Sequence, residues 1–91
     1  MIEVKKREGD EYEVSVRQPN GESHHRVTMT KDVYRRLSNG HASEDELLAA
    51  AFRFLLKRES KEHILARFDI MTIAHYFPDF ERELPNYFHK K

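Results

Sequence analysis

The first third of the chain alternates between apolar and polar residues. Three such runs begin near Ile2, Tyr12 and His25. A period of two places the apolar side chains on one face of a strand and the polar side chains on the other. A Gly-Asp pair separates the first two runs, and a Pro-Asn-Gly-Glu segment, which contains the hairpin signal Asn-Gly, separates the next two. Residues 1–29 therefore predict a three-stranded antiparallel meander.

The residues that follow have the spacing of helices. Thr30 is a candidate N-cap for a short helix over 31–37, which the Asn-Gly pair after it would end. Ser43 and Glu46 have capping-box spacing at the start of a second helix. Its apolar residues recur at helical intervals: Leu47, Leu48, Ala51, Phe52, Leu55 and Leu56. This pattern predicts a long amphipathic helix over 44–59.

The remainder of the chain is expected to form short helices. Ser60 is a candidate cap for a helix reaching residue 68, and Asp69 for a helix over 70–76 that Pro78 ends. Asp79 would cap a last turn before Pro85. The pattern predicts an α+β fold in a single domain over 1–91, with the meander in 1–29 and the helical part in 30–88.

Large apolar side chains are too numerous after residue 67 for a free tail. They either complete the core or cover a partner. Four of them are candidates for a partner-binding surface: Phe68, Tyr76, Phe77 and Phe80.

The amino-acid composition excludes some kinds of site and makes some functions less favoured. The chain has 91 residues and no cysteine, which excludes disulfides and thiolate metal sites and favours a cytoplasmic location. No apolar run is long enough to span a membrane, so no membrane role is expected. Lysine plus arginine equals aspartate plus glutamate, at 16 each, and zero net charge removes the overall electrostatic attraction to nucleic acid.

Candidate catalytic and metal-binding residues are scattered. The six histidines are His24, His25, His41, His63, His75 and His89, and none of their spacings matches a metal motif. Adjacent strand residues point to opposite faces, so the first two do not share a metal. The serines occupy strand, turn or cap positions, and the three glycines occupy turns or helix ends. We therefore expect no catalytic residue, no cofactor, no metal and no enzymatic activity.

The order of strand, short helix and longer helix over 24–58 resembles the ribbon-helix-helix modules. In that family two chains pair one strand each, and alternate strand residues read the major groove of DNA. The resemblance implies nucleic-acid contacts from His24, Arg26 and Thr28, and a phosphate contact from Ser43 at the start of the second helix. This chain departs from the family in placing two further strands before the pairing strand, and a meander within one chain would occupy an edge of that strand.

A second resemblance covers residues 46–80. It rests on four segments of the chain: FRFLLKRE at 52–59, KEHIL at 61–65, FDI at 68–70 and YFP at 76–78. These segments are similar to a pattern, FxFLLxRE…KExIL…FD(I/L)…YFP, of a group of short prokaryotic proteins of unknown function. The resemblance implies that the segment after Ser60 belongs to the domain, and it implies no activity.

Two hypotheses for function remain. The first is a non-enzymatic protein-interaction module that binds an unknown protein or associates with itself, which the aromatic density favours. The second is a DNA-binding regulator or antitoxin of ribbon-helix-helix type. Nucleic-acid binding is possible but is not favoured, because DNA-binding modules of this size usually carry a basic excess.

Overall fold

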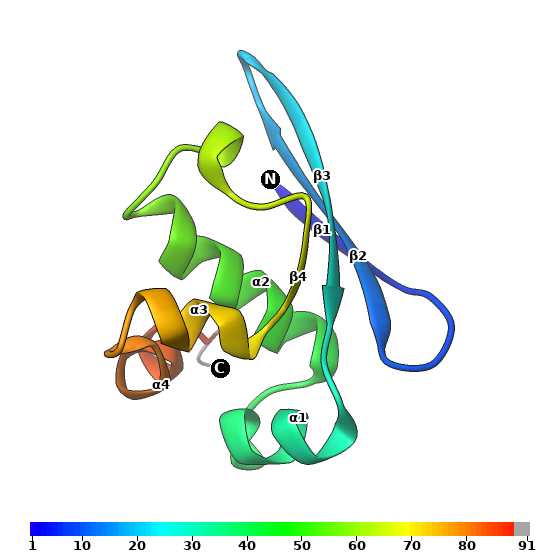
Figure 1. Ribbon diagram of the computed structural model, residues 1–91, viewed down its shortest axis with the longest axis vertical. Helices are drawn as coiled ribbons and strands as arrows, with labels where there is room; N and C mark the ends of the chain where they lie inside the picture. The colour runs from blue at the N-terminus through cyan, green and yellow to red at the C-terminus, as the bar shows by residue number, and fades with distance from the viewer. Residues whose placement is uncertain (89–91) are drawn as a thin grey trace.

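The computed structural model describes residues 1–88 as a sheet with helices on one of its faces (Figure 1). The elements, in chain order, are β1 (Ile2–Lys6), β2 (Glu11–Gln18), β3 (Gly21–Thr28), α1 (Lys31–Ser38), α2 (Glu44–Leu56), the 3₁₀-helix η1 (Lys61–His63), β4 (Arg67–Asp69), α3 (Met71–Tyr76), α4 (Phe80–Glu83) and the 3₁₀-helix η2 (Leu84–Tyr87). The sheet has four strands in the order β1-β2-β3-β4. The predicted α+β fold, with its meander first and its helices after, is confirmed.

The meander is antiparallel, and its register follows the apolar alternation. Val4 lies opposite Val14, which in turn lies opposite His25. The turn between β2 and β3 consists of Pro19 and Asn20, one position earlier than the Asn-Gly pair suggests. Gly21 begins β3 with φ of 139°, a conformation that residues with a Cβ rarely adopt.

The first two helices begin where their caps predict. Thr30 Oγ1 accepts a hydrogen bond from the Val33 amide, and Ser43 Oγ accepts one from the Glu46 amide, each at 3.2 Å. These caps satisfy amides that have no partner inside a helix. The helix α2 ends at Leu56, short of the predicted residue 59, because the apolar positions that face the core stop there.

The segment after α2 differs from the predicted helix over 60–68. It forms one 3₁₀ turn and then β4, which pairs in parallel with β3 and places Arg67 beside Arg26 and Asp69 beside Thr28. The strand is stabilised by bonds to the open edge of β3, including Arg26 amide to Ala66 carbonyl at 2.7 Å. The helix prediction was wrong here because the spacing of apolar residues within a segment does not reveal pairing with a strand that is distant in sequence.

Side chains close in sequence explain part of where α3 and η2 begin. Asp69 Oδ1 accepts a hydrogen bond from the Met71 amide at 2.9 Å, so the predicted cap precedes α3. Pro85 lies within the first turn of η2 rather than ending a helix. Proline is tolerated in a first turn because its missing amide would have no partner there.

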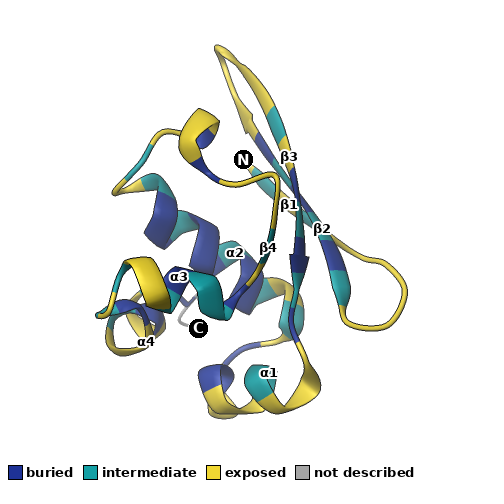
Figure 2. Ribbon diagram, viewed as in Figure 1, coloured by how far each residue is buried: buried dark blue, intermediate teal, exposed yellow. Residues whose placement is uncertain are grey.

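The core lies between the sheet and the short C-terminal helices, with α2 at its centre. Buried residues follow the sides of α2, β2 and β3 that face one another (Figure 2). The largest side chains with almost no exposure include Tyr12, Phe52, Phe54 and Phe80. No helix within residues 1–88 has the length and apolar content to cross a bilayer.

Candidate functional site

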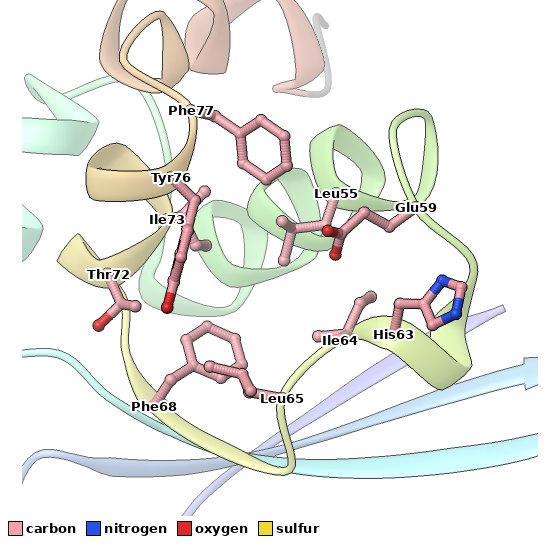
Figure 3. Close-up of a pocket in the computed structure, with 10 residues that line it drawn as sticks. All are labelled: Leu55, Glu59, His63, Ile64, Leu65, Phe68, Thr72, Ile73, Tyr76 and Phe77. Atoms are coloured by element: carbon pink, nitrogen blue, oxygen red, sulfur yellow. The ribbon is translucent and has the colours of Figure 1, made fainter.

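An open pocket of about 230 Å³ lies between α2, the segment that leads into β4, and α3 (Figure 3). We call it the aromatic groove. Its apolar walls are formed by Leu55, Leu65, Phe68, Ile73, Tyr76 and Phe77. Glu59 and His63 line one end, and the Tyr76 hydroxyl and Thr72 lie toward the other (Figure 3). The groove is therefore apolar along its middle and polar at its ends.

The walls of the groove rest on the core. The Phe68 ring is tilted against Phe52 at 6.0 Å, and the Phe77 ring meets Phe54 edge-on at 5.8 Å. Both core phenylalanines come from α2 and are fully buried. Aromatic pairs in these geometries add stabilisation beyond that of area burial. The groove is therefore held in shape without a ligand.

Two large apolar side chains at the groove remain in contact with water. Leu65 is 51% exposed and Tyr76 is 65% exposed. Within residues 1–88, Met1 is the one other large apolar residue that is exposed in this way. Exposed apolar groups gathered at one place mark interaction sites more often than scattered ones do.

The partner surface predicted from the sequence is brought together in part. Phe68, Tyr76 and Phe77 all line the aromatic groove. Phe80 does not, because it is fully buried and meets the Phe54 ring edge-on at 5.1 Å. The prediction that Phe80 belongs to a partner-binding surface is therefore wrong, because α4 directs this ring into the core.

His25 does not line the groove but hydrogen-bonds the backbone of Leu65, which does, and no local pattern in the sequence indicates this contact. Its Nδ1 lies 2.7 Å from the Leu65 carbonyl oxygen, and its Nε2 lies 2.8 Å from Ser23 Oγ. A carbonyl oxygen only accepts, so Nδ1 carries the proton and the neutral ring accepts from Ser23 at Nε2. Burial lowers the pKa of His25, and this outweighs the bond to Leu65, which raises it.

Lys61 joins the segment before β4 to the tip of the β2–β3 hairpin. Its side chain is buried, and its Nζ lies 2.6 Å from a Glu62 carboxylate oxygen and 3.3 Å from Asn20 Oδ1. The hydrogen bond and charge of Lys61 lower the pKa of the Glu62 carboxyl. The position of this lysine depends on contacts that local spacing does not reveal.

The predicted nucleic-acid contacts of β3 share the face of the sheet opposite the helices of residues 1–88. His24 lies 3.3 Å from a Glu22 carboxylate oxygen, and the Thr28 hydroxyl donates to Asp69 at 2.9 Å. Arg26 lies between Glu13 on β2 and Arg67 on β4 in the pairing register. Within residues 1–88 this face therefore mixes carboxylates with cations, and Arg26 and Arg67 are neighbours on it.

Ser43 is separated from those three residues. It caps α2 in the helical layer, on the side of the sheet to which His25 and Val27 point. Three carboxylates follow it in the first turn: Glu44, Asp45 and Glu46. They already complement the positive end of the helix dipole and would repel a phosphate.

No metal site is assembled by the described part of the chain. Within residues 1–88 no three histidine, aspartate or glutamate side chains lie close enough together to hold an ion. His89, the last of the six histidines, lies outside the described residues.

Comparisons with models of protein families, with curated proteins and with solved structures found no match to this chain. A role for the protein therefore has to follow from its own geometry.

Proposed function

We propose that this protein is a non-enzymatic interaction module whose aromatic groove binds a short apolar segment of another protein. One observation carries the proposal: the exposed side chains of Leu65 and Tyr76 flank a groove whose walls are fixed on the core. Interface centres are rich in aromatic residues, and their anchors fill preformed pockets. A preformed groove lowers the entropy lost on binding.

The ends of the groove favour a particular partner chemistry. The Glu59 carboxylate lies at one end, and no cation within residues 1–88 forms an ion pair with it. A lysine or arginine next to the apolar residues of the partner would complement this charge. The partner segment is therefore expected to combine large apolar side chains with a basic residue.

The test is a comparison of Leu65→Asp with a matched control. Leu65→Asp places a charge at the rim of the groove, whereas Gln18→Asp makes the same change of charge on the exposed end of β2, outside the groove. Each tagged protein is used to capture partners from an extract of the cells that contain it. A captured protein is then purified and titrated against all three forms.

The wild type and Gln18→Asp are expected to retain the same partner, and Leu65→Asp to bind it roughly tenfold or more weakly. Thermal unfolding of each form checks that the fold is intact. Equal affinity of the wild type and Leu65→Asp for every captured protein would refute a role for the groove.

The ribbon-helix-helix alternative has less support. β4 is hydrogen-bonded to β3 over Arg26–Thr28, where that family would pair a second chain, and the uncovered face of the sheet has mixed charge. A mobility-shift assay with random duplex DNA at low salt separates the two functions. A salt-dependent shift that Arg26→Ala weakens would favour a DNA-binding regulator, and no shift favours the interaction module.

A further inference from the structure

Within residues 1–88, one edge of β1 pairs with no other strand, and it lies at the side of the sheet opposite β4. Met1 and Arg17 exchange two backbone hydrogen bonds, and the Arg7 amide donates to the Glu11 carbonyl at 2.8 Å. In an antiparallel pair, hydrogen-bonded positions recur at every second residue. The odd-numbered residues of β1 therefore face β2, and Ile2, Val4 and Lys6 direct their amides and carbonyls away from the sheet.

The charges of β1 are complementary to those of a second β1 in one register. If two copies pair antiparallel about a two-fold axis at Val4, Glu3 of each copy lies opposite Lys5 of the other. Shifting the centre to Glu3 or to Lys5 instead brings two like charges face to face. Opposite charges across a ladder stabilise it and like charges destabilise it, so the charges select the Val4 register.

The inner face of this edge also favours the Val4 register. Ile2 and Val4 are only half-buried by their own chain. In this register Val4 lies against Val4 of the second copy, and Ile2 lies against the stem of Lys6, whose amine is 3.7 Å from a carboxylate oxygen of Glu44 in its own chain. Pairing would therefore cover apolar surface and leave the lysine amine with its partner.

We propose that two copies of this chain associate through β1, antiparallel and centred on Val4, so that one sheet continues through both. The contact is two-fold symmetric and therefore closes on itself as a dimer. It lies at the edge of the sheet far from the aromatic groove, which borders β4. The groove remains open to another partner in this dimer.

Charge reversal provides the test. Glu3→Lys places lysine opposite Lys5 of the second copy at two positions, and Lys5→Glu places glutamate opposite Glu3 at two positions. Each variant alone is expected to raise the dimer dissociation constant roughly tenfold or more in sedimentation equilibrium at low salt. An equimolar mixture of the two variants restores both opposite-charge pairs, so it is expected to form heterodimers with nearly the wild-type dissociation constant.

The mixture controls for effects inside each chain. Glu3 also lies 3.0 Å from its own Arg17, and Lys5 lies opposite Glu13, so each reversal disturbs its own fold slightly. Mixing changes neither chain, and a recovery therefore reports contact between chains. Val4→Pro is the second variant: it removes an amide that points away from β2, and we expect a folded monomer.

Three results would overturn the proposal. They are a wild type that stays monomeric into the millimolar range, a dimer that both charge reversals leave unchanged, and a mixture that associates no better than its components. Leu65→Asp is expected to dimerise like the wild type. A loss of dimer there would assign self-association to the aromatic groove instead of β1.

Discussion

His25 on β3 donates a hydrogen bond from Nδ1 to the carbonyl oxygen of Leu65, at 2.7 Å and across 40 residues of sequence. The bond connects the inner face of the meander to the segment that leads into β4. Because the Leu65 side chain stands at the rim of the aromatic groove, the same bond fixes one edge of the proposed binding surface. A buried imidazole thus links the core of the sheet to the groove.

The stability of the protein should depend on pH through His25. Burial lowers its folded-state pKa below the ordinary 6.5, so the unfolded chain binds the proton more tightly. The free energy of unfolding is therefore expected to be unaffected by His25 above that value, and to fall as pH drops through the folded-state pKa. Urea unfolding at a series of pH values measures this.

A variant of the same residue tests the source of this pH dependence. His25→Gln should remove a part of the acid-side loss of stability, because glutamine takes up no proton in this pH range. Identical profiles for the wild type and His25→Gln would contradict a buried, neutral His25.

Truncation of the same side chain should be costly at neutral pH. His25→Ala leaves the Leu65 carbonyl and the Ser23 hydroxyl without their partner and opens a cavity against the Phe52 ring. We expect a loss of about 2–4 kcal/mol in the free energy of unfolding. His24→Ala, measured in the same denaturant series, is expected to change it by less than about 0.5 kcal/mol.

Two aromatic residues four positions apart should differ sharply in their effect on stability. Phe80→Ala empties a fully buried site beside Phe54 and is expected to cost about 3–5 kcal/mol. Tyr76→Ala removes a largely exposed ring at the groove and should cost less than about 1 kcal/mol. Chemical unfolding of both variants checks the assignment, and a small effect of Phe80→Ala would contradict its place in the core.

The Lys61–Glu62 contact should be visible in the titration of the glutamate. The Lys61 ammonium holds the pKa of the Glu62 carboxyl below its ordinary value. Lys61→Met keeps most of the buried volume and removes the charge and the hydrogen bond, so the pKa of Glu62 should rise toward the ordinary value of a glutamate. Carboxyl NMR titration of the wild type and of Lys61→Met measures the change, and an equal pKa of Glu62 in the two forms would contradict the contact.

Elements that local interactions stabilise can be predicted from the amino-acid sequence alone. Alternation with period two is enough to define the meander, since it depends on neighbours in one strand and on a short turn. The caps of α1 and α2 likewise depend on side chains three residues from the amides they bind, at Thr30 and Ser43. These features could be predicted because the alternation, the turns and the caps can each be recognised within a short stretch of sequence.

The way in which distant parts of the chain share the core depends on tertiary contacts. β4 is a strand because β3 offers an open edge at Arg26, and a helix was predicted there because that edge is remote in sequence. Tertiary contacts also explain why Phe80 is buried in the core and Tyr76 is exposed, although both are large and aromatic. Composition says that a side chain is apolar, but whether it is buried depends on which surfaces the folded chain brings against it.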